Sequence, residues 1–479
     1  MAAPASLKNI VLRNSLWLYV GQVVSKLVKF FLIVYAARLL GPLQYGVFTY
    51  TLYLLGLFFL FADLGLSSYL VREYQKNEIN KDRLVGITVF CKMALLIINV
   101  AGAIFFYTFI QEDAVRSIYF ILLTVICVGQ IRDIFVMIAR ANSQMRYEGI
   151  STIVESVITT GVGLTVLFTA PSLVNFAISY VFGAITAGIV MILLTKKLYR
   201  AIKIPTLGEV RVIFSTSILF LITSIIISLL SQIDIIMLKF MKGLEVVGYY
   251  SASLKIVQTL LFLPLPFIVS LFPAISSIAT DIKAITAIVR RSTSLLALLG
   301  IPIMVGGYLL GAQIIMRLFG PEYAESVAPF YILIMLIPVY FQVLILDDVL
   351  LALNYQKRNM QYTFFAALLN ILLNFILIPA YSMQGAAIAT LIAQAVNLIM
   401  TYRLTKRILG VPFFDYRSTA CAITASICML IGLISLKQLS LPLEISILVG
   451  GVIYGIVLML LKEQSTLYLL AHAKSLIQK

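Results

Sequence analysis

Long apolar runs constrain the fold of this 479-residue chain more than any other feature. Because an α-helix needs about 20 apolar residues to cross about 30 Å of hydrocarbon, the runs predict about 14 transmembrane spans. They cover residues 16–39, 47–70, 84–110, 117–140, 150–170, 174–194, 212–239, 246–275, 293–318, 328–353, 360–379, 385–402, 418–436 and 444–461. They lack the alternation of β-barrel strands. We therefore expect an all-α polytopic membrane protein.

The composition excludes a water-soluble globule. Apolar and aromatic residues make up 61% of the chain and charged residues 12%, against about 25% charged residues in an ordinary soluble domain. A formal charge of +16 would suggest a nucleic-acid partner in a soluble chain. Here most of the basic residues lie between the apolar runs, so we expect contact with membrane lipids and no nucleic acid.

Lysine and arginine are concentrated in one set of alternating connections. About 25 of the 36 lie at the N-terminus, in the even-numbered connections and in the C-terminal tail, and about six lie in or beside the odd-numbered ones. The positive-inside rule then predicts a multi-pass protein of the cytoplasmic (inner) membrane with both termini in the cytoplasm. The first run is too long for a cleaved signal peptide, and we expect it to be retained.

Residue types that carry enzymatic chemistry are sparse. The single histidine, His472, lies near the C-terminus, and the four cysteines lie inside apolar runs without CxxC spacing. These features argue against a metal site, a catalytic triad and a disulfide framework. The sequence also lacks the phosphate-binding loop of ATP-hydrolysing proteins. We therefore expect a transporter with no catalytic residues, metal or cofactor.

A short repeat indicates an internal duplication. Residues 41–52 and 243–254 share two glycines, a leucine and a pattern of aromatic and hydroxyl residues. Six intervening spans give both copies the same orientation, as in lobes related by an axis along the membrane normal. This predicts two pseudo-symmetric six-helix lobes around a central cavity, residues 1–204 and 205–408, followed by two extra helices and a cytoplasmic tail in 409–479. Chance similarity of two turns is the alternative.

Several short motifs share their order and spacing with a known family of transporters. They are Arg38-Leu39-Leu40-Gly41-Pro42 with Tyr45-Gly46, Asp63-Leu64-Gly65-Leu66 with Arg72, Phe319-Gly320-Pro321-Glu322-Tyr323, Asn370-Ile371-Leu372-Leu373-Asn374, Ile378-Pro379-Ala380-Tyr381 and Gly385-Ala386-Ala387-Ile388-Ala389-Thr390. Together they resemble the polysaccharide-transporter branch of the multidrug/oligosaccharidyl-lipid/polysaccharide exporter superfamily. The resemblance implies a flippase that moves a polyprenyl-pyrophosphate-linked oligosaccharide from the cytoplasmic to the outer leaflet by alternating access, for cell-surface polysaccharide biosynthesis.

Polar residues inside the apolar runs are the candidates for a substrate site. A flippase of this kind needs cations for the pyrophosphate and hydrogen-bonding groups for the sugars. A polar stripe from Ser15 to Lys29 occupies about 80° of the first helix, and a comparable stripe from Ser224 to Lys239 occupies the seventh. The substrate-binding candidates are Gln22, Lys26, Lys29, Arg132, Gln232 and Lys255. For the two lysines of the first run, pairing with an acidic residue of a neighbouring span is the alternative.

Acidic residues in the runs are candidates for coupling transport to Na⁺ or H⁺, and the sequence does not choose between these ions. The candidates are Asp63, Asp234, Asp347 and Asp348. The alternative is that such acids, Glu155 among them, are hydrated at a cavity mouth or form salt bridges.

A multidrug exporter and a membrane enzyme are the alternatives to a flippase. A cation-coupled multidrug exporter of the same fold should favour acidic over basic residues at mid-membrane, whereas Lys26, Lys29 and Arg132 are basic. A membrane glycosyltransferase or ligase usually needs a sizeable extracytoplasmic loop, and the odd-numbered connections here are short. A flippase for lipid II-type peptidoglycan precursors is a sub-case of the favoured function. We expect a monomer, because the small residues Gly451 and Gly455 are assigned to packing within the chain.

Overall fold

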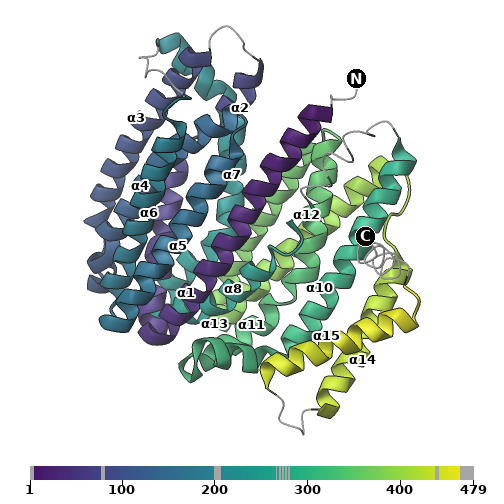
Figure 1. Cartoon of the computed structure of the whole chain (residues 1–479). Coiled ribbons are helices and arrows are strands. Elements are labelled where there is room, and N and C mark those ends of the chain that lie inside the picture. Colours follow the sequence, from purple (N-terminus) through teal and green to yellow (C-terminus); the bar gives the residue numbers. More distant parts are fainter. Residues whose placement is uncertain are drawn as a thin grey trace. The chain divides into compact units, whose positions relative to one another are not determined.

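The computed structural model describes residues 5–463 apart from residues 77–80, 199–205, 437–441 and several positions between 266 and 280. Within this described part of the chain, all regular secondary structure is helical (Figure 1). The chain divides into two compact units, Met1–Ser251 and Ala252–Lys479. The boundary between them falls inside α8 (Leu244–Leu260).

The N-terminal unit contains the helices that coincide with the first seven predicted runs. They are α1 (Ala5–Phe59), η1 (Leu60–Ala62), α2 (Leu66–Lys76), α3 (Lys81–Tyr107), α4 (Asp113–Ala141), α5 (Met145–Thr169), α6 (Leu173–Thr195) and α7 (Leu207–Lys242), followed by the start of α8. Helix α5 packs against α1 and α6, and α4 packs against α3 and α6 (Figure 1). At the α5–α6 crossing a Cβ on Gly183 would lie 1.8 Å from Thr159 Oγ1, so the small residue sets this close approach.

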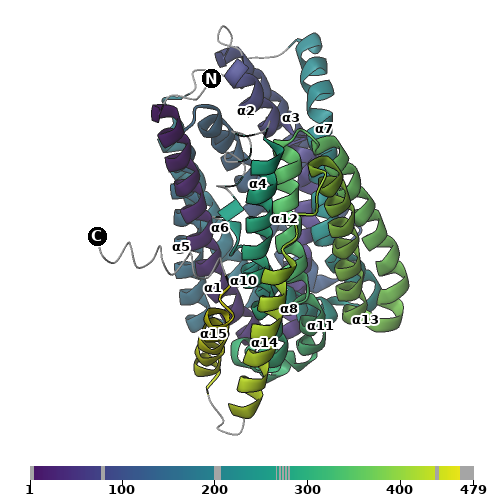
Figure 2. The ribbon, with the colours of Figure 1, turned by 90° about the vertical axis from the view of Figure 1, so that its right-hand side faces the viewer.

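The C-terminal unit contains the remaining helices. They are α10 (Ile282–Phe319), η2 (Pro321–Ser326), α11 (Val327–Leu333), α12 (Leu336–Ala352), α13 (Gln356–Leu409), α14 (Tyr416–Leu436) and α15 (Leu443–Leu460), after the end of α8. Helix α12 packs against α10 and α13, and α14 packs against α10 and α15 (Figures 1 and 2). Exposed aliphatic side chains line α14 and α15, among them Ile431 and Leu448, as expected for helices that face lipid.

Helix breaks subdivide some of the predicted runs. Leu64 and Gly65 have positive φ angles of 44° and 77°, and the chain bends by 44° before α2. The tenth run bends by 45° between α11 and α12. Helix α8 ends at Leu260, four residues before Pro264, because proline removes a backbone donor and clashes with the preceding turn. The second, eighth and tenth runs are therefore not single straight helices.

Two pairs of neighbouring runs are continuous in the structure. Helix α1 contains the first run and the start of the second, joined through Gly41 at φ 78°, ψ 170°. Helix α13 contains the eleventh and twelfth runs, joined through Ser382 at φ 50°, ψ −133°. By length and hydropathy, eight of the described helices could each cross a membrane, and up to ten spans result if each bent pair counts as one.

The two segments paired by the sequence repeat pack on one another within the N-terminal unit. Gly243 ends α7 at φ 97°, ψ 175°, nearly the conformation of Gly41. A Cβ on Gly46 would lie 1.8 Å from the Leu244 carbonyl oxygen, and a Cβ on Gly248 would lie 1.9 Å from the Pro42 carbonyl oxygen. The contact is reciprocal, as a local two-fold relation between the copies requires. The predicted lobe boundaries at residues 204 and 408 stay predictions.

Candidate functional site

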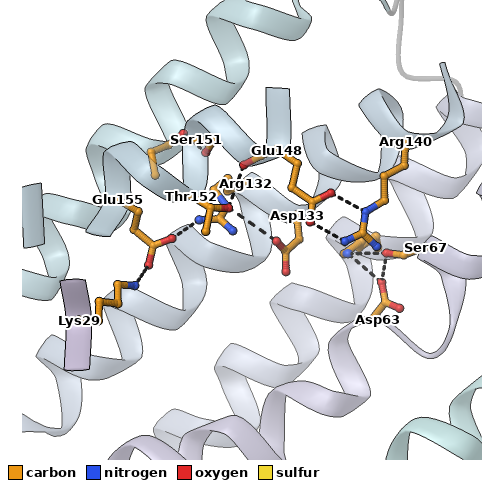
Figure 3. Close-up of polar contacts among 12 residues, drawn as sticks. Lys29, Asp63, Ser67, Arg132, Asp133, Arg140, Glu148, Ser151, Thr152 and Glu155 are labelled. Atoms are coloured by element: carbon orange, nitrogen blue, oxygen red, sulfur yellow. Dashed lines mark hydrogen bonds and ion pairs between the residues drawn. The ribbon is translucent and has the colours of Figure 1, made fainter. Parts of the chain in front are cut away.

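Charged side chains from α1, α4 and α5 meet inside the N-terminal unit. Lys29 Nζ on α1 lies 2.5 Å from Glu155 Oε1 on α5. Arg132 on α4 donates to the other oxygen, Oε2, of the same carboxylate. Figure 3 shows the Glu155 carboxylate between these two cations. The side chains of Lys29, Arg132 and Glu155 keep 24%, 17% and 20% of their surface exposed, so the cluster is not sealed inside protein.

The parallel course of α1 and α5 brings Lys29 to Glu155. A Cβ on Gly21 would lie 2.8 Å from Gly149 Cα, and Ser25 Oγ donates to the Thr152 carbonyl oxygen at 2.6 Å. Successive contacts advance by about one helical turn on each helix. The small residues at the crossing thus set the register that pairs the lysine with the glutamate.

The α4–α5 hairpin brings Arg132 and Arg140 to acidic residues of α5. Its turn is short, with Ser143 at φ 57°, so residues at similar distances before and after the turn face one another. Arg140 donates through Nε and Nη2 to Glu148 at 2.7 and 2.6 Å. In this pair one guanidinium binds one carboxylate through two hydrogen bonds. The Glu155 carboxylate, in contrast, is shared between two cations from two helices.

A further ion pair lies where α2, α3 and the turn after η1 meet. Lys92 Nζ lies 2.7 Å from Asp63 Oδ1, and Ser67 Oγ donates to the same oxygen at 2.5 Å. Only 3% of the Lys92 side chain is exposed. Asp133 lies between this pair and the α5 cluster, with Oδ1 at 3.9 Å from Arg132 Nε, and Figure 3 shows the groups following one another in a row.

The charges of this row balance. Its cations are Lys29, Lys92, Arg132 and Arg140, and its carboxylates are Asp63, Asp133, Glu148 and Glu155. Charges inside a membrane protein are expensive unless they are paired or hydrated, which explains why an acid accompanies each base. Lys26, one turn before Lys29 on α1, adds a further cation with an exposed side chain.

Two buried hydroxyl groups adjoin the Glu155 cluster. Thr159, one turn beyond Glu155 on α5, has 1% of its surface exposed, and Tyr180 on α6 has 9%. Among the described residues neither hydroxyl has a hydrogen-bond partner. Helix α6 packs on α5 at Glu155, since a Cβ on Gly183, three residues after Tyr180, would lie 3.0 Å from the Glu155 carbonyl oxygen. Two unused donors therefore lie near Glu155, one on α5 and one on α6.

The other sequence-predicted residues are distributed over both units. Gln22 on α1 is half-buried, and Gln232 on α7 has a buried Oε1 with no hydrogen-bond partner in the described structure. Lys255 on α8 is half-buried and belongs to the C-terminal unit. The side chains of Ser15 and Ser224, which begin the predicted polar stripes, and the whole of His472 lie outside the described residues.

Three of the four coupling candidates have well-defined partners. Asp63 pairs with Lys92, as described, and buried Asp234 accepts a hydrogen bond of 2.8 Å from Tyr250 Oη. Asp347 on α12 accepts one of 3.0 Å from Asn359 Nδ2 on α13. Salt-bridge pairing, the alternative role for these acids, thus holds for Asp63.

The cations of this cluster are predictable from the sequence, but their partners are not. Lys29 and Arg132 are brought together by Glu155, an acid that was not among the predicted substrate-site residues. Lys29 therefore has the acidic partner that the alternative interpretation foresaw. An acid within an apolar run was the available signal, but its partner lies 126 residues away in the sequence.

The fold is similar to that of solved transporter structures. The structure is similar to a solved structure described as "Lipid II flippase MurJ, inward closed conformation", with a TM-score of 0.79, 14% identity and coverage of 92% of this chain and 97% of that one. It is also similar to a multidrug resistance MATE family transporter of the MOP superfamily in an inward-facing conformation, with a TM-score of 0.65, 11% identity and coverage of 84% and 98%. At these identities the likeness shows the fold.

The family follows from the sequence itself. The family model described as "Polysaccharide biosynthesis protein" matches residues 11–279, more than half of the chain. The chain belongs to this family, which confirms the resemblance drawn from the motifs.

Named relatives are transport proteins. The chain is 29% identical to "Probable flippase AglR" of Haloferax volcanii over 49% of its length, and it spans only 51% of that relative. It is 23% identical to "Probable low-salt glycan biosynthesis flippase Agl15" of the same organism, with coverage of 91% of this chain and 94% of the relative. It is 24% identical to "Putative O-antigen transporter" of Escherichia coli K12, with coverage of 80% and 93%. These relatives confirm the predicted multi-pass membrane transporter rather than an enzyme.

Proposed function

We propose that this protein is a flippase that moves a polyprenyl-pyrophosphate-linked oligosaccharide from the cytoplasmic to the outer leaflet by alternating access, for cell-surface polysaccharide biosynthesis. Family membership and the names of the relatives support a role in glycan transport. The observation that carries the substrate class is the partly exposed cationic pair of Lys29 and Arg132 inside an apolar helical unit.

The chemistry of the two cations suits a pyrophosphate. Arg132 offers a planar fork of donors that matches two phosphate oxygens, and Lys29 offers a compact charge. We assign substrate contact to this pair, to Lys26 and Gln22 on the same face of α1, and to Gln232 and Lys255. Amide side chains can donate to and accept from sugar hydroxyl groups.

The proposed architecture has about 14 spans in two pseudo-symmetric six-helix lobes, residues 1–204 and 205–408, around a central cavity, with α14 and α15 outside both lobes. The reciprocal packing of Gly46 and Gly248 supports the duplication. The excess of Lys and Arg in alternate connections supports cytoplasmic termini in the cytoplasmic membrane. In that orientation the charged row lies toward the cytoplasmic ends of α4 and α5.

Coupling to Na⁺ or H⁺ is part of the proposal, with Asp63, Asp234, Asp347 and Asp348 as the candidate residues. Asp347 accepts a hydrogen bond from a neutral donor, the Asn359 amide, so its charge is not cancelled by that contact. Proteoliposomes with an imposed Na⁺ or pH gradient distinguish the two ions.

A lipid II-type precursor flippase is the second candidate. The similar solved structure described as a lipid II flippase brings this candidate into consideration. Both substrates are polyprenyl-pyrophosphate glycolipids, so the cation pair serves either. Complementation of a strain that lacks its peptidoglycan-precursor flippase separates the two candidates. Growth of the complemented strain indicates a peptidoglycan precursor. No growth, together with loss of surface polysaccharide when this protein is deleted, indicates another glycan.

The central test uses a strain that lacks the protein and is complemented with Lys26→Ala plus Lys29→Ala. We expect lipid-linked oligosaccharide to accumulate in the inner leaflet at normal membrane abundance of the variant. Lys406→Ala plus Arg407→Ala, which removes two exposed bases at the end of α13, is the matched control and should transport normally. No accumulation in the deletion strain itself, with unchanged surface polymer and altered drug sensitivity, would reject the flippase and favour a drug exporter.

A further inference from the structure

The Glu155 carboxylate has the contacts that a bound phosphate would have. One oxygen accepts from Lys29 at 2.5 Å and the other accepts from Arg132. The two donors come from different helices, α1 and α4, and all three side chains are partly exposed. A carboxylate and a phosphate group both offer acceptor oxygens to charged nitrogen donors at similar distances.

We propose that Glu155 is an internal competitor for the substrate's pyrophosphate at Lys29 and Arg132. The pyrophosphate displaces the carboxylate when it binds, and the carboxylate displaces the pyrophosphate when the substrate leaves. This inference rests on the proposed function and deepens it, because it assigns the release of an anionic headgroup to a residue outside the predicted substrate site.

Two buried hydroxyl groups can serve the displaced carboxylate as hydrogen-bond partners. Thr159 is one turn from Glu155 on the same helix, a spacing at which side chains meet. Tyr180 lies on α6, which packs closely on this part of α5: a Cβ on Gly183, three residues after Tyr180, would lie 3.0 Å from the Glu155 carbonyl oxygen. Both hydroxyl groups are more than nine-tenths buried and have no hydrogen-bond partner in the described part of the chain. A carboxylate that leaves the cations can accept hydrogen bonds from these two donors.

The neighbouring ion pair provides a contrast. Glu148 accepts two hydrogen bonds from a single guanidinium, that of Arg140, across the α4–α5 hairpin. These two hydrogen bonds join α4 to α5, and their geometry fits a clamp on the hairpin. Glu148→Gln is therefore the matched control for Glu155→Gln: both remove one carboxylate charge from α5 at constant size.

The first experiment measures binding of farnesyl diphosphate to the purified full-length protein in detergent by calorimetry. The neutral amide introduced by Glu155→Gln no longer competes for the cations, so we expect this variant to bind at least about tenfold more tightly than the wild type, which corresponds to about 1.4 kcal/mol. Glu148→Gln should bind like the wild type, and Lys29→Ala should bind more weakly. In cells, Glu155→Gln should slow export because release is impaired, with lipid-linked oligosaccharide accumulating despite the tighter binding.

A second measurement tests the place to which the carboxylate moves. Thr159→Val plus Tyr180→Phe removes both unused donors at nearly constant shape. The double variant should weaken binding of farnesyl diphosphate in the wild-type background and leave it unchanged in the Glu155→Gln background, a coupling that a double-mutant cycle detects. Equal weakening in both backgrounds would contradict this part of the inference.

The experiments distinguish a wrong competitor role of Glu155 from a wrong flippase function. If the wild type binds farnesyl diphosphate and its deletion causes accumulation, but Glu155→Gln binds no more tightly, only the competitor role is wrong. If neither the wild type nor any variant binds and the deletion strain accumulates nothing, the flippase itself is rejected. Should Glu155→Gln fail to fold, Glu155→Asp keeps the charge but shortens the side chain, and its affinity must then exceed that of the wild type.

Discussion

At the scale of single residues, charge compensation governs the interior of the N-terminal unit. Lys92 is almost fully buried against Asp63, and Glu155 is shared by Lys29 and Arg132. Isolated charges in a low-dielectric interior are far less stable than paired ones. Each of these buried or half-buried bases therefore implies a nearby acid, whose identity depends on packing.

The Lys92–Asp63 pair should make a measurable contribution to stability. Lys92→Met leaves Asp63 without its cation and should lower the free energy of unfolding by about 3 kcal/mol. Adding Asp63→Asn to Lys92→Met should recover most of this loss, because both charges are then absent. The midpoint of heat-induced loss of monodisperse protein in detergent reports the effect, and a double variant as unstable as the single one would contradict the explanation.

An ion pair between Lys239 and Glu112 lies at the start of α4. Lys239 Nζ lies 2.7 Å from Glu112 Oε1, and this hydrogen bond is the main reason that the pKa of Glu112 lies below its ordinary value. A lowered pKa stabilises the folded state above the ordinary glutamate pKa of about 4.3, and this stabilisation is lost as the pH falls through the folded value. Glu112→Gln should remove that part of the acid sensitivity. Melting curves between about pH 3 and pH 7 should converge for the two proteins at the acidic end.

At the scale of helices, small residues decide which segments can touch. The repeat copies pack so closely that backbone atoms of Pro42 and Leu244 occupy the space of a side chain on Gly248 and Gly46. The same copies contain Gly41 and Gly243 at positive φ, a conformation that costs glycine little. The repeat therefore reflects two turns that fit together, and not only two turns of similar sequence.

This packing predicts a strong effect of a single methyl group. Gly46→Ala places a Cβ 1.8 Å from a carbonyl oxygen, which only a backbone shift can relieve, and should destabilise the protein by about 2 kcal/mol or more. The matched control is Gly102→Ala in α3, where a Cβ meets nothing within 4 Å and helix propensity should stabilise by up to about 1 kcal/mol. Thermal unfolding in detergent compares the two, and equal melting temperatures would refute the close-contact explanation.

At the scale of the whole molecule, the fold is shared with flippases and drug transporters at low sequence identity. The fold alone therefore does not select a substrate. Side chains at particular positions, above all the cations of α1 and α4, carry the glycolipid proposal. The proposed orientation in the membrane rests on the distribution of Lys and Arg in the connections.

Cysteine labelling tests that orientation. In a variant with the native cysteines replaced by alanine, Ser143→Cys lies in the α4–α5 turn and Ala170→Cys lies after α5. Both native residues are exposed. A membrane-impermeant maleimide added to intact cells should label position 170 and reach position 143 only after lysis. The reverse pattern would invert the topology.

The positions of the long helices can be predicted from the apolar runs, because helix formation in lipid depends on local features: the length of an apolar run, and the glycine or proline that ends it. Each long helix of the described structure overlaps a predicted run. The break at Leu64–Gly65 was missed, since the apolar run continues through it.

Which acid pairs with which base depends on how the helices pack, and the apolar runs do not predict it. Lys29 could have paired with any acid at its depth, and the choice of Glu155 follows from the small-residue crossing of α1 and α5 at Gly21 and Gly149. Likewise, the sequence placed Asp63 among the coupling candidates, and packing of α2 on α3 gave it Lys92. Hydropathy acts along the chain within one helix, whereas charge pairing acts across helices that are distant in sequence, and only packing brings those helices together.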